Sequence, residues 1–243
     1  MSTPAVFVAA RTLLATLWAS RASKLLLGAG VVLLGVVAVG SRASWIDPGT
    51  AYSIRTTLLV PGLPVVAVAV AELPLRDGLT QRTLLYPLLG PVPRSLLCLV
   101  RSLVAALVLC LGMSALVLLL RPFSSAPTEG LGRELGAIAL GSASYVGLFG
   151  LLHLLSKHGL VAGLGLALGD YLLGKVPFSM RGFAPAAHLA NLADISIVDT
   201  HGLPLPVSPI ELGTSIGVLC VVGLVGVALT AWRFTRMDLQ ELC

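Results

Sequence analysis

The seven residues from Gly169 to Lys175, GDYLLGK, have the spacing of the GxxxxGK motif that opens a phosphate-binding loop. Such a loop also needs a serine or threonine directly afterwards, to hold magnesium, and a β-strand before it. Here the next residue is Val176, and the motif ends an apolar run that reads as a helix. The sequence therefore predicts that this segment does not bind a nucleotide.

A serine and a histidine within hydrogen-bond distance would indicate an intramembrane serine protease of rhomboid type. Ser142 and Ser144, in the segment Gly-Ser-Ala-Ser, could supply the nucleophile. The last apolar run, residues 212–232, contains no histidine, and His153 lies about three turns further along the serines' own helix. These positions do not favour protease chemistry.

His188 and His201 are the other candidates for chemistry, with Asp194 and Asp199 between them. The four side chains could ligate a metal ion, but zinc sites are marked by closely spaced ligand pairs, and none occurs here. The four cysteines lie in apolar runs or at the C-terminus, so they suggest no disulfide framework. The sequence predicts no metal site.

Asp170 lies near the end of an apolar run, five residues before Lys175. A carboxylate at the centre of a membrane span costs about 2.5–3.5 kcal/mol, and less near the surface. We therefore expect Asp170 to lie at the membrane interface beside Lys175, with its side chain directed to water. His153 and His158 flank the other membrane surface and are also expected at an interface.

The composition indicates a membrane protein. Of the 243 residues, 56% are hydrophobic and 11% are charged, and the mean hydropathy is +0.97. Soluble domains average about 25% charged residues. The length allows roughly six membrane helices of about 20 residues, with no room for a soluble domain. The net charge of +5 is spread over short loops, so it indicates no nucleic-acid partner.

The pattern of apolar runs predicts one all-α transmembrane domain with six spans. An amphipathic N-terminal helix at residues 3–20 is expected to lie on the membrane surface, and the polar residues 175–209 to form an outer re-entrant or capping segment before span 6. Pro61 and Pro64 are expected to kink or locally unwind span 2. The six spans are expected at residues 25–40, 57–71, 96–120, 135–155, 159–174 and 212–232.

The distribution of basic residues predicts the orientation. With both termini in the cytoplasm, ten lysines and arginines lie on the cytoplasmic side and six on the other side, which agrees with the positive-inside rule. Arginine outnumbers lysine 13 to 3, and Ala, Gly, Leu and Val are abundant, as is typical of a GC-rich bacterial genome. We expect a multi-pass protein of the bacterial cytoplasmic (inner) membrane.

The connection between spans 2 and 3 is the most polar stretch between two apolar runs. Its segment RDGLTQRTLLY has a helical pattern, with Leu79 and Leu84 on one face and Arg76 and Arg82 elsewhere. Three prolines follow and end the helix. A short amphipathic helix held between two spans is a surface that a soluble partner could bind.

This loop resembles the corresponding loop of ABC-2 type transporter permeases. That family has an acidic residue, a glycine, a Leu-Leu pair, a proline and two basic residues there. The matching residues are Asp77-Gly78, Leu84-Leu85, Pro87, Arg94 and Arg101. Leu79 stands before Thr80, where the family has threonine directly after the glycine, and the Pro-x-x-Arg spacing is met only from Pro91 to Arg94. The basic aromatic tail after span 6 and the segment Phe183-Ala184-Pro185 with His188 also agree with the family.

The resemblance implies a permease subunit of an ATP-driven ABC exporter. Such a complex pairs this chain with a second permease chain, identical or related, and with two copies of an ABC ATPase subunit. The chain would be no enzyme and would bind no cofactor itself, since ATP and Mg would be held by the ATPase. The short loop helix would be a cytoplasmic coupling helix in a groove of that ATPase, with leucine and tyrosine anchors and arginines at the rim. The docking residues would be Arg76, Asp77, Gly78, Leu79, Arg82, Leu84, Leu85 and Tyr86.

Two other classes stay open at this point. One is the rhomboid-type protease considered above. The other is a passive channel or scaffold protein, for which the loop arginines would only follow the positive-inside rule and no ATPase partner would exist. The glycine pairs Gly165/Gly169 and Gly213/Gly217 would permit close helix contact in any of these classes.

Overall fold

The computed structural model describes residue 11 and residues 21–72, 93–124, 130–176, 179–197 and 209–237. Within these ranges the chain forms helices and connecting turns without a strand, so the all-helical class is confirmed for them. The predicted interfacial helix, residues 3–20, lies outside the described residues apart from Arg11. Residues 73–92, which include all eight predicted docking residues, also lie outside them.

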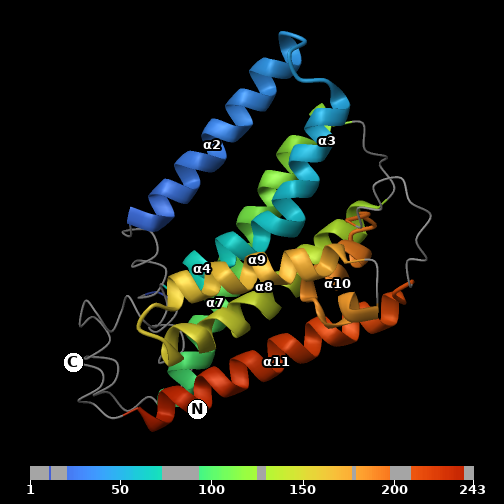
Figure 1. The fold of residues 1–243 in the computed structure, drawn as a ribbon. Coiled ribbons are helices and arrows are strands. Elements are labelled where there is room, and N and C mark those ends of the chain that lie inside the picture. Colours follow the sequence, from blue (N-terminus) through green and yellow to red (C-terminus); the bar gives the residue numbers. More distant parts are fainter. Residues whose placement is uncertain are drawn as a thin grey trace.

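The long helices run back and forth between two ends of a bundle (Figure 1). The elements in chain order are α2 (Arg21–Arg42), α3 (Pro48–Thr57), the π-helix η1 (Leu58–Gly62), α4 (Leu63–Glu72), α7 (Arg94–Leu120), the 3-10 turn η3 (Arg121–Phe123), α8 (Leu131–Leu155), α9 (Gly159–Lys175), the 3-10 turn η4 (Ser179–Phe183), α10 (Pro185–Leu192) and α11 (Leu212–Arg236). We call the end where α4 ends and α7 begins the loop end. The opposite end, where α10 lies, is the cap end.

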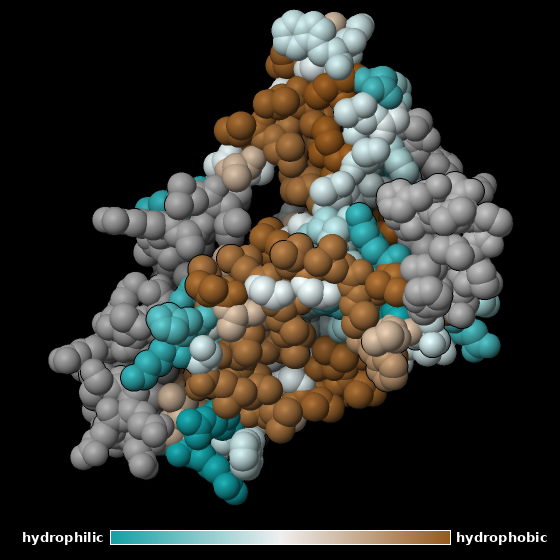
Figure 2. All heavy atoms as spheres, in the orientation of Figure 1, coloured by the Kyte–Doolittle hydropathy of each residue, from teal (hydrophilic) through white to brown (hydrophobic). Residues whose placement is uncertain are grey.

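Four helical stretches of the described chain are long and apolar enough to cross a membrane. Their hydropathy lies between 1.7 and 2.9, and Figure 2 shows apolar residues across the middle of the molecule with hydrophilic residues towards its ends. By the same measure, residues Gly28–Arg42 of α2 form a shorter apolar helix, and α9, with 17 residues, is not among the candidate spans. The chain is thus a helical membrane protein. The four long stretches are Pro48–Glu72, Arg94–Phe123, Leu131–Leu155 and Leu212–Arg236.

The second long helix begins nine residues before the predicted residue 57. Asp47 caps α3, because its carboxylate accepts hydrogen bonds from the backbone N–H groups of Gly49 (2.9 Å) and Thr50 (3.1 Å), and Pro48 occupies the first helical position. The Thr50 hydroxyl donates to the same carboxylate, and these bonds hold the pKa of Asp47 below its ordinary value. Most of residues 41–56, which lie between the predicted spans 25–40 and 57–71, are therefore helical rather than a loop.

Pro61 lies inside this helix without ending it. The turn Leu58–Gly62 is π-helical, which is wider than an α-helical turn, and α4 continues from it in the same direction. A proline has no N–H to donate, so a wider turn accommodates the missing bond. The expected local disturbance of the helix therefore takes this form, with Pro64 in the first turn of α4.

α8 is the central helix, and its closest neighbour is α11. The two backbones approach where glycines face each other: a Cβ on Gly226 would lie 2.6 Å from the carbonyl carbon of Gly147, and a Cβ on Gly147 would lie 2.8 Å from the Gly223 oxygen. Ser144 Oγ lies 2.6 Å from the Leu219 carbonyl of α11, and Thr230 Oγ1 lies 3.3 Å from the Gly147 carbonyl of α8. The two glycine pairs singled out from the sequence do not make such contacts, since a Cβ at any of those four positions would meet no heavy atom within 4 Å.

α2 stands away from the other helices over much of its length (Figures 1 and 2). Its contacts lie towards the cap end, where Val37 is buried with Ala51 of α3 and Leu120 of α7. The opposite face of α2 carries exposed valines, among them Val31 and Val36. α2 therefore presents an apolar face that no other described helix covers.

The glycine contact between α8 and α11 predicts a large effect for one added methyl group. We expect Gly226→Ala to lower the free energy of unfolding by about 1–3 kcal/mol, because the Cβ would meet backbone atoms that cannot move aside like a flexible side chain. Gly217→Ala, on the same helix, is the control, since its Cβ would meet nothing within 4 Å. Thermal unfolding in detergent measures both variants. Equal midpoints for the two would show that the contact does not hold the helices together.

Candidate functional site

The loop end carries the flanks of the predicted docking segment. α4 ends at Glu72 and α7 begins at Arg94, and these two helices pack against each other. Adjacent antiparallel helices are usually joined by about 2–8 residues. Here residues 73–93 join them, 21 in all. This connection is much longer than the distance between the two helices requires.

Two arginines of the family pattern have defined places at this end. Arg94 Nη1 donates a hydrogen bond to the Met237 carbonyl (3.2 Å), which joins the start of α7 to the end of α11. Arg101 is only 2% exposed, beside Cys98, and its Nε has no hydrogen-bond partner. The described residues of the loop end include seven basic residues and one acid, Glu72. The basic residues are Arg21, Lys24, Arg94, Arg101, Lys157, Arg233 and Arg236.

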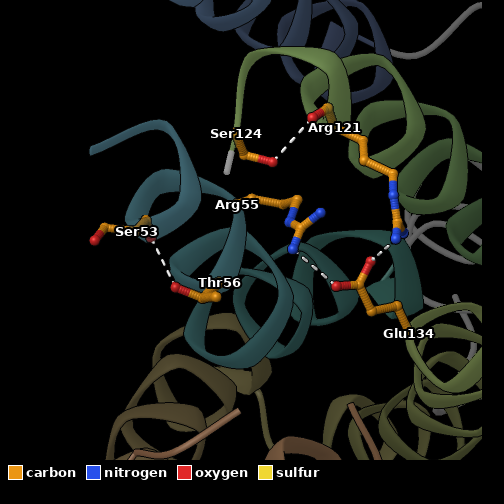
Figure 3. A network of polar contacts seen from close by, with 6 residues as sticks. All are labelled: Ser53, Arg55, Thr56, Arg121, Ser124 and Glu134. Carbon is orange, nitrogen blue, oxygen red and sulfur yellow. Dashed lines mark hydrogen bonds and ion pairs between the residues drawn. The ribbon is translucent and has the colours of Figure 1, made fainter. Parts of the chain in front are cut away.

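At the cap end, Glu134 of α8 binds two arginines that the sequence places in loops (Figure 3). Its carboxylate lies 3.0 Å from Arg55 Nη2 and 3.3 Å from Arg121 Nη1. The exposed fractions of the three side chains are 10% for Glu134, 3% for Arg55 and 15% for Arg121. The carboxylate thus bridges two guanidinium groups in a poorly hydrated place. The network joins α3, η3 and α8.

The Asp170 side chain is not directed to water, so this part of the sequence prediction is wrong. Its carboxylate turns inward and accepts hydrogen bonds from the Tyr145 hydroxyl (2.5 Å) and from the backbone N–H of Ala186 (3.1 Å). Ala186 is in the first turn of α10, where backbone N–H groups have no partner within the helix and the helix dipole attracts an anion. The Lys175 ammonium lies instead over the ring of Tyr171, 4.8 Å from its centroid. Asp170 thus fastens α10 to α8 and α9.

α10 is the buried part of the capping segment. It packs against α8, α9 and α11, and six of its eight residues are buried. The other end of the helix is held by Arg133, which donates to the carbonyls of Asn191 (2.9 Å) and Leu192 (3.1 Å) and pairs with Asp194 (3.3 Å). An arginine at the last carbonyls is a favourable helix end. The described part of residues 175–209 is therefore packed against the bundle, and its place on the outer side of a membrane stays a prediction.

A serine and a histidine do meet in this protein, but not the pair considered from the sequence. His188 Nδ1 lies 3.2 Å from Ser215 Oγ, and His188 Nε2 lies 2.8 Å from the Gly182 carbonyl. Because a carbonyl only accepts, Nε2 carries the hydrogen and Nδ1 accepts from the serine hydroxyl, which is the arrangement of a nucleophile and its base. Asn191 also donates to Ser215 Oγ (2.8 Å). The sequence search missed the pair because it looked for a histidine within the last span.

Burial argues against a hydrolytic role for this pair. Ser215 is 0% exposed and His188 is 1% exposed, so a substrate carbonyl cannot reach the serine oxygen in this arrangement. Ser144, the earlier candidate, is bonded to backbone carbonyls. The pair instead fastens α10 to α11, as Asp170 fastens it to α8 and α9.

The other residues considered from the sequence, His153, His158 and Gly169–Lys175, lie in or next to helices. His153 is buried rather than interfacial, with Nε2 2.9 Å from the Val68 carbonyl of α4, whereas His158 is exposed before α9. Gly169–Lys175 is helical, so its N–H groups are used within α9 and cannot surround a phosphate. Among the described residues, no group of three or more His, Cys, Asp or Glu side chains could hold a metal, while His201 and Asp199 lie outside them.

One cleft of about 290 Å³ opens beside the π-helical turn. It is lined by residues 56–57 and 60–61 of the second long helix, by Tyr171 and Lys175 of α9, and by residues 195–197 after α10. The wide turn at Pro61 and the end of α10 thus border the same space. The cleft has hydroxyl groups, one ammonium group and apolar side chains on its walls.

The Glu134 network predicts a large loss of stability on neutralising the acid. We expect Glu134→Gln to destabilise the protein by about 3–5 kcal/mol, since Arg55 would be left buried without its counter-ion. The double variant Arg55→Met/Glu134→Gln should recover much of that loss, because it removes the unpaired charge. Glu211→Gln, an exposed acid at the same end, is the control. Thermal unfolding of the four proteins checks this, and a double variant no better than Glu134→Gln would contradict it.

The Asp170 contacts predict protection of the cap from trypsin. Arg181 is buried next to α10, so wild-type protein should resist cleavage after it. Asp170→Ala should raise the cleavage rate there at least tenfold, because α10 loses both its contact to Tyr145 and the partner of its first N–H. Asp194→Asn, which removes a surface pair and keeps a residue type that tolerates the φ of 61° at this position, should change the rate less than twofold. Rapid cleavage of the wild type would show that the cap is not packed.

Comparison of the chain with models of protein families, with curated proteins and with solved structures found no match. Two features of the chain have functional potential. One is the long connection between α4 and α7 at the loop end. The other is the cleft at the cap end, held in shape by the polar contacts of α10.

Proposed function

We propose that this chain is the membrane-spanning permease subunit of an ATP-driven transporter of the ABC-2 type, acting as an exporter. The observation that carries the proposal is the connection between α4 and α7. These helices are packed neighbours, yet residues 73–93 join them. A chain that needs only a turn at this point has instead a polar segment with an amphipathic pattern, and binding a partner is the simplest use for it.

The charge of the loop end supports a cytoplasmic partner. Seven basic residues and one acid of the described chain lie there, and the positive-inside rule then places this end in the cytoplasm. At the cap end, by contrast, Arg55, Arg121 and Arg133 are paired with acids of the protein. In the proposed complex the ATPase binds ATP and Mg, and this chain receives force through residues 76–86.

Helix directions support six crossings. α2, α3–α4, α7, α8, α9 and α11 alternate in direction, so the start of α2 and the end of α11 lie at the loop end (Figure 1). Both termini are then cytoplasmic, in a bacterial inner membrane. α10 lies at the cap end between α9 and α11, as the outer capping segment of the proposed family would. The uncovered valine face of α2 is available to the second permease chain.

The proposed coupling segment predicts that two carboxylates will uncouple the complex. Leu84→Asp/Leu85→Asp should reduce co-purification of the ATPase about thirtyfold, since losing a buried anchor costs about 2 kcal/mol and 1.4 kcal/mol is one decade. Substrate-stimulated ATP turnover should fall with it. The helices should stay inserted, because this segment contacts water and the partner rather than lipid. Pull-down of the permease with its ATPase, followed by turnover measurements, tests this.

Ser44→Asp/Ser53→Asp is the matched control, since it adds the same two charges at exposed positions of the cap end. It should leave co-purification and turnover unchanged. Wild-type co-purification by the Leu84/Leu85 variant would remove the coupling role and favour the channel or scaffold class. A serine protease would be favoured only if the buried pair His188–Ser215 reacted with a fluorophosphonate probe in the intact protein.

A further inference from the structure

The described walls of the cleft at the cap end carry one positive charge and no acid. Lys175 is the one charged side chain among the described residues that line it. The ammonium lies over Tyr171 and forms no salt bridge with a described acid. Asp170, the nearest acid along the chain, is turned away by its bonds to Tyr145 and Ala186, and Asp194 is paired with Arg133. An anion entering the cleft would therefore meet a cation that no described side chain neutralises.

The other walls suit an organic molecule rather than a bare ion. Thr57 and Ser196 present exposed hydroxyl groups, and Tyr171, Ile195 and Ile197, which are half-buried, provide apolar surface. The volume of about 290 Å³ is at the lower end of the range for small-molecule sites.

We infer that this cleft binds a small acidic organic molecule, with a carboxylate or phosphate at the Lys175 ammonium and hydrogen bonds to Thr57 and Ser196. The apolar part of the molecule would pack on Tyr171 and Ile197. That this molecule is the exported substrate rests on the proposed function. The binding itself does not, because all the residues invoked belong to this chain.

The same chemistry could come from a lipid, since headgroup phosphates also lie at a membrane surface. The two sources differ in their response to the bilayer. A soluble molecule would bind in a bilayer of any composition, whereas an anionic headgroup would already fill the cleft when anionic lipid is present.

The test uses the full chain in phosphatidylcholine nanodiscs, without ATPase. Binding of 4-methylumbelliferyl phosphate and of uncharged 4-methylumbelliferone is measured by equilibrium dialysis. Wild-type protein should bind the phosphate at least tenfold more tightly than the uncharged compound. Lys175→Gln should remove that preference, and Lys175→Arg should retain it. Arg42→Gln, an exposed cation of the same end, should leave it within twofold.

Equal binding of the two compounds by the wild type would overturn the inference, as would an unchanged preference in Lys175→Gln with its thermal midpoint intact. Loss of wild-type binding in nanodiscs that contain phosphatidylglycerol would assign the anion to lipid and overturn the soluble ligand. If binding behaves as expected while the Leu84/Leu85 variant still co-purifies with ATPase normally, the acidic-ligand site stands and the coupling proposal fails.

Discussion

The close approach of α8 and α11 is the contact on which the rest of this fold depends. In lipid the hydrophobic effect does not drive helices together, so association relies on close packing and on hydrogen bonds between helices. Gly147, Gly223 and Gly226 let the two backbones touch, and Ser144 and Thr230 add hydroxyl contacts to carbonyls of the facing helix. α4, α7 and α10 then pack on this pair, whereas α2, which has few such contacts, stands apart.

Polar side chains inside the bundle serve mainly to fix the cap. Asp170, Arg133 and the pair His188–Ser215 each bond to a different part of α10, so this eight-residue helix is fastened to α8, α9 and α11 together. A helix this short would not be stable alone. Its position in turn shapes the cleft, because residues 195–197 follow it directly and form one wall. Asp170, His188 and Ser215, which were candidates for chemistry or for an interface, thus hold the cap and one wall of the cleft in place.

Hydropathy alone locates helices in this chain better than it locates contacts. The long apolar runs that become α7, α8 and α11 are evident in the sequence, because each is long enough and apolar enough to cross a membrane as a helix. The early start of α3 was also readable, from Asp47 capping and Pro48 at the first helical position, but the polar residues around Arg55 suggested a loop. The inward turn of Asp170 and the meeting of Glu134 with Arg55 could not be predicted. They depend on how each helix is rotated about its own axis. The sequence does not reveal that rotation, because an apolar side chain can face either lipid or the protein core.

The Glu134 network also has a consequence for biosynthesis. Arg55 leaves the ribosome 79 residues before Glu134, which at typical rates of synthesis is roughly 4–16 s. During that interval the helix that carries Arg55 enters the membrane without its counter-ion, so the guanidinium must stay near hydrated headgroups. Only when α8 arrives can the arginine move into its final place. We therefore expect the helix that carries Arg55 to reach its final packing only after α8 has been synthesised. In a nascent chain that ends before α8, the unpaired Arg55 charge would hold that helix end at the membrane surface.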